Sequence, residues 1–250
     1  MFDLSYKYKK PTKLFGTNNA KTIKGEKLGY TTYILYMSPH KQNTKGKNIC
    51  PKATKGCAKS CLFTAGMGKF SNVKLGRLNK TEYFLRERNN FMADIAKELT
   101  IAVKKHGVDK MCVRLNGTSD IRYENIPVGD YPNIMSMFPD VQFYDYTKIA
   151  SRFTDTLPKN YHLTFSMAET EENKAECFEL LNKGYNVAGV FNVKDETQLP
   201  KKYKGYKVIN GDQHDLTFLH KTKGKKGLII GLKAKGTAKK DESGFVIRDF

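Results

Sequence analysis

The apolar residues of this chain fall into short continuous segments separated by stretches with helical spacing. Tyr30–Met37 is rich in β-branched and aromatic side chains, which is typical of a buried strand. Apolar residues at steps of three or four predict a long helix over Thr81–His106, capped by Thr81 and ended by Gly107. The same criteria predict helices at Asn133–Phe138 and Glu171–Lys183, and strands at Lys110–Leu115, Val141–Tyr144, Tyr161–Ser166, Asn186–Phe191, Lys207–Asn210 and Gly227–Leu232.

Strands that alternate with helices are typical of a parallel sheet built from βα units. We expect an α/β fold, a partial or irregular (β/α) barrel with about six to seven mostly parallel strands. A doubly wound open sheet is the alternative, although no G-x-G-x-x-G segment follows a predicted strand. Residues 1–29 are polar and Lys-rich and predict a basic N-terminal arm, so that 30–250 forms a single α/β domain.

Residues 38–80 show little periodicity and predict a long Cys-rich loop, and a loop of that length is usually functional. It contains Cys50, Cys57 and Cys61 within 12 residues. Thiolates at this spacing suit a [4Fe–4S] cluster with one iron open to a small ligand. The alternatives are zinc, with His40 as a fourth ligand, and metal-free thiols. We expect this segment to be the metal loop of the domain.

The chain contains five cysteines, and this odd number argues against a disulfide framework. Cys112 alternates with apolar residues in a predicted strand, and Cys177 follows the apolar pattern of a predicted helix. Both are therefore expected in the core rather than at the metal.

Polar side chains follow several predicted strands at the point where each strand ends. In parallel α/β folds this edge is where ligands bind. Asn116 and Asp120 suit the amino or hydroxyl groups of a ligand, and Asp145 suits acid–base chemistry. Local turn formation and a salt bridge at the edge of the sheet are the alternative roles. The predicted ligand-binding residues are Arg114, Asn116, Ser119, Asp120, Tyr144, Asp145, Lys148 and Ser166.

The formal net charge is +19, with 44 Lys and Arg against 25 Asp and Glu. Such a charge favours an anionic partner, either a small molecule or nucleic acid. The alternative explanation is compositional, because Lys far outnumbers the Arg that base recognition prefers. The mean hydropathy of -0.57 and the absence of a long apolar run predict no membrane span. The first residues do not form a secretory signal, so a cytoplasmic protein is expected.

The cysteine segment resembles an uncharacterised bacteriophage family named after gene product eighty-eight of a mycobacteriophage. The likeness extends over about residues 30–250 and implies a phage protein of the host cytoplasm. Its motifs are Cys50-Pro-x-Ala-x-x-Gly-Cys57-x-x-x-Cys61-Leu with Thr64-Ala-Gly66-x-Gly68, Arg114-Leu-Asn116-Gly117-x-Ser119-Asp120, Phe143-Tyr144-Asp145-Tyr146-Thr-Lys148, and Gly231-Leu-Lys233-Ala-Lys-Gly236 with Asp241 and Ser243-Gly-Phe245.

A more distant likeness is to radical SAM enzymes, which are partial (β/α) barrels with a three-Cys [4Fe–4S] cluster after the first strand. In them S-adenosylmethionine (SAM) chelates the open iron. The position of the Cys loop after the first long strand is similar. The spacing here is Cys-x₆-Cys-x₃-Cys, whereas the usual pattern in those enzymes is Cys-x-x-x-Cys-x-x-Cys. SAM is therefore one of the ligands that this resemblance implies.

Two functional hypotheses follow from these observations. The first is a phage-type iron–sulfur protein whose open iron, at the mouth of a partial barrel, binds SAM or another small ligand. The second is a non-enzymatic, metal-stabilised module that binds nucleic acid or a host protein. The sequence does not specify a reaction.

Overall fold

The computed structural model describes residues 6–18, 20–61, 66–222 and 224–250, which belong to two compact units. The first unit contains Met1–Pro51, Met67–Phe143 and Thr156–Tyr161. The second contains Lys52–Gly66, Tyr144–Asp155 and His162–Phe250. Each unit is therefore assembled from three separate stretches of chain.

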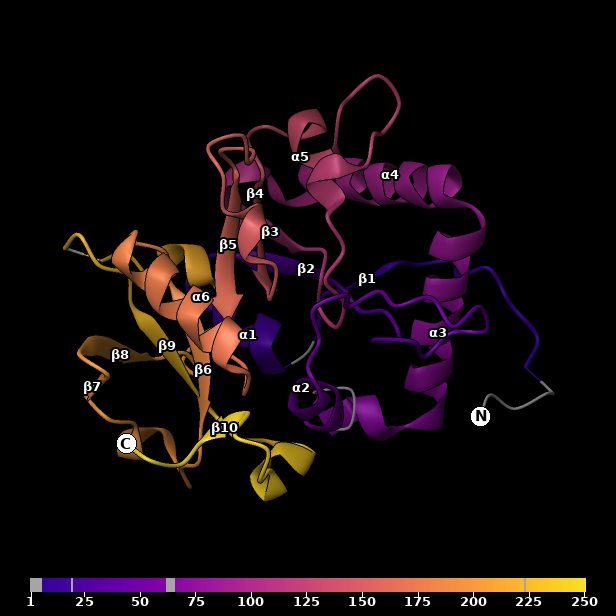
Figure 1. The fold of residues 1–250 in the computed structure, drawn as a ribbon. Coiled ribbons are helices and arrows are strands. Elements are labelled where there is room, and N and C mark those ends of the chain that lie inside the picture. Colours follow the sequence, from indigo (N-terminus) through magenta and orange to yellow (C-terminus); the bar gives the residue numbers. More distant parts are fainter. Residues whose placement is uncertain (1–5, 19, 62–65, 223) are drawn as a thin grey trace. The chain divides into compact units, whose positions relative to one another are not determined.

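The first unit contains three parallel strands and an antiparallel addition. Strands β2 (Thr31–Leu35), β3 (Met111–Arg114) and β4 (Gln142–Thr147) pair in parallel in that order, with Tyr33 opposite Val113 and Val113 opposite Phe143. Strand β1 (Phe15–Gly16) pairs antiparallel with β2. The helices are α1 (Ala20–Glu26), α3 (Ser71–Arg86), α4 (Arg88–His106), which packs against β3, and the short α5 (Ile134–Met137) (Figure 1).

The long helix predicted from Thr81 begins instead at Ser71 and breaks at Glu87, where φ is -137° and ψ is 56°. Thr81 is therefore not an N-cap. It is buried inside α3, where its hydroxyl donates to the Arg77 carbonyl and accepts from the Ser38 N–H. Residues 71–80 are mostly polar, so their helical spacing is weak in the sequence. The end at Gly107, with φ of 77°, is confirmed.

Part of the predicted N-terminal arm has regular structure. Leu14 and Phe15 are 1% and 2% exposed, and the N–H groups of both donate to the Glu98 carboxylate of α4. Residues 1–5 and 19 lie outside the described part of the arm. From Tyr6 onward this segment is thus tied to the first unit.

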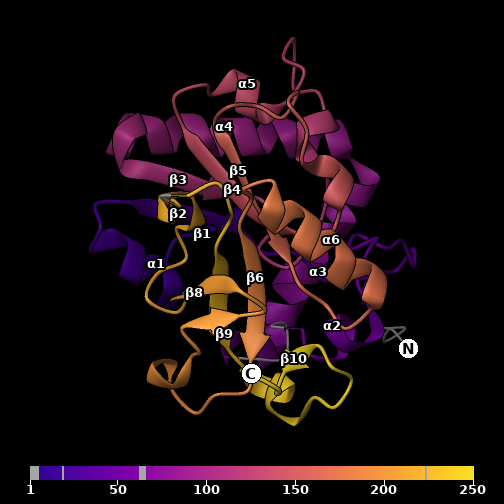
Figure 2. The same cartoon turned by 60° about the vertical axis from the view of Figure 1, so that its left-hand side comes forward.

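The second unit has the strand order β5-β6-β9-β8-β7, with β10 paired to β6. All of these pairs are parallel except β7–β8. Helix α6 lies beside β6, as Figure 2 shows. The bounds are α2 Lys55–Lys59, β5 Tyr161–Ser166, α6 Glu171–Asn182, β6 Val187–Phe191, β7 Lys202–Tyr203, β8 Tyr206–Asn210, β9 Ile229–Lys233 and β10 Val246–Ile247.

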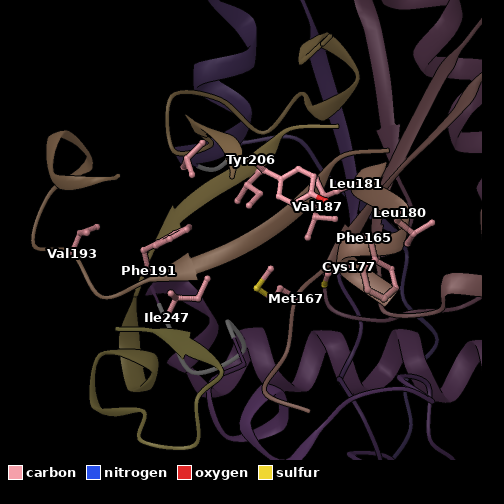
Figure 3. Packing of buried hydrophobic residues seen from close by; sticks show 12 residues of the cluster. Phe165, Met167, Cys177, Leu180, Leu181, Val187, Phe191, Val193, Tyr206 and Ile247 are labelled. Atoms are coloured by element: carbon pink, nitrogen blue, oxygen red, sulfur yellow. The ribbon is translucent and has the colours of Figure 1, made fainter. Parts of the chain in front are cut away.

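The core of the second unit lies between its strands and α6 (Figure 3). Phe165 of β5 and Val187 of β6 are fully buried, together with Cys177 and Leu181 of α6. Because side chains alternate along a strand, His162, Thr164 and Ser166 share the opposite face of β5. One face of this strand is therefore apolar and the other is polar.

The mixed α/β fold with mostly parallel strands is confirmed. The seven predicted strands correspond to β2, β3, β4, β5, β6, β8 and β9. The three additional strands, β1, β7 and β10, have two residues each, which is too short for a periodic signal. Among the described residues, the strands of neither unit pair end to end into a closed barrel. Within the same residues, no helix is long and apolar enough to cross a membrane.

Candidate functional site

In the second unit, Cys57 lies on the short helix α2 and Cys61 follows its C-cap Ser60, and a carboxylate holds the N-terminal end of this helix. Glu169 follows β5 by three residues. One of its oxygens accepts from the Thr54 hydroxyl at 2.6 Å and the other from the Gly56 N–H at 2.7 Å. Thr54 caps α2 in turn, because its hydroxyl accepts from the Cys57 N–H at 3.1 Å. Glu169 thus satisfies the free donors at the start of the cysteine-bearing helix.

A second carboxylate, Asp241, holds the other end of the same helix. It is 2% exposed and accepts from the Ser243 hydroxyl at 2.7 Å, from the Val246 N–H at 3.0 Å and from the Ser60 hydroxyl at 3.4 Å. Burial opposes ionisation of this carboxyl, but the hydrogen bonds outweigh burial and hold its pKa below the ordinary value. The Thr237 hydroxyl also donates to the Lys59 carbonyl at 3.0 Å. The C-terminal segment therefore fixes α2.

Gly56 is required by close packing at this point. A Cβ on Gly56 would lie 2.3 Å from the Ser243 Oγ and 2.9 Å from the Glu169 carboxyl group. The glycine of the Gly-Cys57 motif thus permits the backbone of α2 to reach both anchoring side chains. Gly56 and Ser243, which belong to motif segments nearly 190 positions apart, therefore lie close together.

The five thiols divide into two classes by exposure. Cys50, Cys57 and Cys61 are partly exposed, whereas Cys112 and Cys177 are buried, and none forms a disulfide. Burial raises the pKa of the Cys177 thiol to about 12, as expected for a core residue. Within the described residues, no three or more His, Cys, Asp or Glu side chains are grouped so as to hold a metal ion.

Cys50 lies in the first unit, against the loop that follows β3. Its Sγ accepts from the His40 N–H at 3.3 Å, and the thiol reaches the Thr118 carbonyl at 3.7 Å. The Asp120 N–H donates to the carbonyl of Ile49, the neighbour of Cys50, at 2.9 Å. The predicted loop of ligand-binding residues and this cysteine are therefore adjacent.

Asn116 organises that loop. Its Oδ1 accepts from the Ser119 hydroxyl and the Ile121 N–H, both at 2.8 Å, and its Nδ2 donates to the Ile121 carbonyl at 3.0 Å. This is the local turn role that the sequence left open for Asn116 and Ser119. Arg114 and Asp120 are 5% and 8% exposed. The assignment of these residues to ligand binding stays a prediction.

The remaining predicted residues belong to the second unit, where Tyr144 and Asp145 lie in the part of β4 that this unit contains, Lys148 directly follows β4, and Ser166 ends β5. The Lys148 ammonium donates to the Ser166 hydroxyl at 2.8 Å and lies 5.5 Å above the Phe245 ring. Tyr144 and Asp145 are both buried. The Tyr144 hydroxyl makes a long 3.5 Å contact with Asp215. Lys148 and Ser166 are thus brought together at the ends of their strands.

Sequence reasoning did not assign a site role to four side chains that shape this site, namely Glu169, Asp241, Ser243 and Asp215, although Asp241 and Ser243 are part of the C-terminal motif. Asp215 is 3% exposed and accepts from the hydroxyls of both Tyr144 and Tyr146. The partners of Glu169 and Asp215, and Ser60 as a partner of Asp241, are 69 or more positions away, so no local pattern connects them. The only local signal was Thr54 three residues before Cys57, which is the spacing of an N-cap.

Comparison with known proteins identifies one relationship. No curated protein and no solved structure matches the chain, and the more distant likeness to radical SAM enzymes is not supported. The family model described as Gene product 88 matches residues 12–249. This match covers nearly the whole chain and includes all of the cysteine, strand-end and C-terminal segments described above. The chain therefore belongs to the Gene product 88 family.

Proposed function

We propose that this chain is an iron–sulfur protein in which Cys50, Cys57 and Cys61 ligate a [4Fe–4S] cluster with one iron open to a small ligand. The proposal rests on the difference in exposure between two groups of cysteines. The three from one 12-residue segment are partly exposed, whereas the other two are in the core. Thiolates are the ligands that such clusters prefer, and three of them leave one iron available.

The anchoring of α2 supports a role beyond packing. Two carboxylates and three hydroxyl groups fix a helix of only five residues. Helices this short are not stable alone, so the network must impose the position of Cys57. Ligands that are oriented by their surroundings before binding are typical of functional metal sites.

The ligand of the open iron is proposed to be SAM or another small polar molecule. Lys148 and Ser166 are paired at the strand ends, and the Lys148 charge suits an anionic group such as a carboxylate. This part of the proposal concerns binding alone and names no reaction.

The test is purification without oxygen, followed by iron and sulfide analysis and a visible spectrum. We expect about four iron atoms and four sulfides per chain, with an absorption band near about 400 nm. Cys57→Ser and Cys61→Ser should abolish the band. Cys177→Ala is the matched control, since it removes a buried thiol, and should retain the band.

Three results would contradict the proposal. These are a protein without metal after reconstitution, a band that survives in Cys57→Ser, and a band lost equally in Cys177→Ala while the circular dichroism stays native. If a cluster forms, addition of SAM to the reduced protein should change its electron paramagnetic resonance spectrum. An unchanged spectrum would remove SAM as the ligand.

The second candidate is a metal-stabilised module that binds nucleic acid or a host protein. The observation in its favour is the net charge of +19. One zinc per chain without colour, together with nucleic-acid affinity that falls steeply with salt, is the result expected for it.

A further inference from the structure

The second unit contains a cavity of about 680 Å³ that extends along β8 and reaches the residues just before β9. Its described lining shares no residue with the site described above. Val208 of β8 packs in the core, Lys207 and Ile209 line the cavity, and Tyr206 belongs to both. Binding sites for small molecules usually have volumes of about 300–1,000 Å³. The cavity is therefore large enough for a metabolite or a nucleotide.

The charged side chains that line this cavity are basic. They are Lys207, Lys221, Lys225 and Lys226, and the described residues of the lining include no Asp or Glu. The Lys226 ammonium lies 5.2 Å above the Tyr206 ring, so its stem is held against an aromatic surface. A concave surface lined by four ammonium groups concentrates anions, and phosphate is the anion that lysine commonly binds.

Two histidines form part of the wall. The rings of His214 and His220 are stacked, with centroids 4.6 Å apart and an interplanar angle of 14°. Burial lowers the pKa of His220 to about 4, assisted by the nearby His214 and His162, while Asp215 opposes the shift. Both rings are therefore neutral near pH 7. His214 Nδ1 and His220 Nε2 are buried without a hydrogen-bond partner among the described residues, which is costly unless a ligand completes them.

Hydrogen bonds and close backbone packing fix the wall of the cavity. Asn186 is 6% exposed, and its Nδ2 donates to the His220 carbonyl at 2.7 Å while its Oδ1 accepts from the Leu228 N–H at 2.9 Å. Gly227 allows a further close approach, because a Cβ there would lie 1.8 Å from the Tyr185 carbonyl oxygen. These contacts tie the histidine segment to the start of β9 and so pre-form the cavity.

We propose that this cavity binds a phosphorylated small molecule, with the lysines contacting its phosphate and the histidine pair contacting its polar body. The proposal goes beyond the metal centre and does not depend on it. Cys57→Ser protein should bind the same ligand with unchanged affinity.

The test is calorimetric titration of the full chain with AMP, ATP and inorganic pyrophosphate as probes. We expect saturable binding of at least one probe with one site per chain. Lys207→Gln combined with Lys225→Gln should weaken it by at least about tenfold, because hydrogen bonds to charged groups are lost. Lys202→Gln combined with Lys204→Gln removes the same charge from exposed positions that do not line the cavity. This control should change affinity less than about twofold.

A further titration distinguishes a small phosphorylated ligand from the phosphate backbone of a nucleic acid. A single-stranded oligonucleotide that binds tightly and is weakened equally by both double variants would overturn the proposal, and would assign the charge to a nucleic-acid surface. The absence of saturable binding by all three small probes would also overturn it. In His214→Phe, a loss of affinity for the probe with a native unfolding curve would support the role of the histidine pair.

Discussion

At the scale of single residues, two carboxylates fix the helix α2 that carries the Cys57 thiol. Glu169 accepts two hydrogen bonds at the start of this helix, and Asp241 accepts three around its end. Hydrogen bonds to charged groups contribute roughly 1.5–3 kcal/mol each, about twice the usual value. The donors of these hydrogen bonds are hydroxyl and backbone N–H groups, so we regard Glu169 and Asp241 as positioning residues.

Glu169→Ala should loosen α2 without unfolding the second unit. The Gly56 N–H and the Thr54 hydroxyl lose their acceptor, and the amides of residues 54–60 should exchange with deuterium at least about tenfold faster. Glu172→Ala is the matched control, because its 3.2 Å ion pair with Lys52 is exposed and contributes little. Equal exchange rates in both variants and in the wild type would show that Glu169 does not hold the helix.

At the scale of elements, a strand of two residues connects the core of the second unit to helix α2. Strand β10 contains two residues, Val246 and Ile247, which are 2% and 8% exposed and pair in parallel with Val190 and Phe191 of β6. The same segment positions Asp241 and therefore α2. A strand without a periodic signal thus links the core of the second unit to its cysteine helix.

Truncation after Lys240 should lower the free energy of unfolding by about 3–6 kcal/mol, because two fully buried aliphatic side chains contribute roughly 1.5–3 kcal/mol each. Urea denaturation followed by circular dichroism measures this change. Truncation after Arg248 removes only Asp249 and the half-exposed Phe250 and should change the stability much less. If the two truncated proteins are equally stable, β10 does not stabilise the unit.

The elements that could be predicted are those with enough residues to repeat a pattern. Strands β2 and β3 were visible as short segments rich in apolar, β-branched or aromatic residues, and helix α6 was visible because burial on one face produces a period of 3.6 residues. Helix α3 was missed over residues 71–80, since its sequence is polar and contacts from the rest of the unit stabilise it. The break at Glu87 has no proline or glycine to mark it.

At the scale of the whole molecule, buried ionisable groups determine how stability depends on pH. Burial lowers the pKa of His162 to about 4. Its imidazole therefore stays neutral in the folded chain while it becomes protonated in the unfolded chain below pH of about 6.5. The carboxyl groups of Glu82 and Asp241, whose pKa values lie below the ordinary range, act in the same direction at lower pH.

The free energy of unfolding should therefore be highest near neutral pH and fall as the pH decreases from about 6.5 to 4. His162 alone should contribute up to roughly 3 kcal/mol to this decrease. Urea denaturation at several pH values measures it, and His162→Leu should flatten the curve over that interval. A variant with the wild-type slope would show that His162 is protonated equally in both states.

The residues that we propose as ligands form a pattern in the sequence, whereas the side chains that hold α2 do not. The spacing of Cys50, Cys57 and Cys61 is a local pattern, and so is the Asn116–Ser119 turn. Glu169 and Asp241 reach their partners across 113 and 181 positions, which only the folded chain brings together. The four lysines that line the cavity beside β8 also could not be recognised as a group, because the whole chain is rich in lysine.

The 181 positions between Ser60 and Asp241 also impose an order on synthesis. A ribosome adds about 5–20 residues per second. Asp241, which anchors the helix of Cys57, is therefore synthesised roughly 10–40 s after Cys57. During that interval the thiols are carried on a nascent chain in which α2 has no support. Any assembly of a centre on these thiols should therefore follow synthesis of Asp241, and translation products that stop before Asp241 should expose the thiols to oxidation.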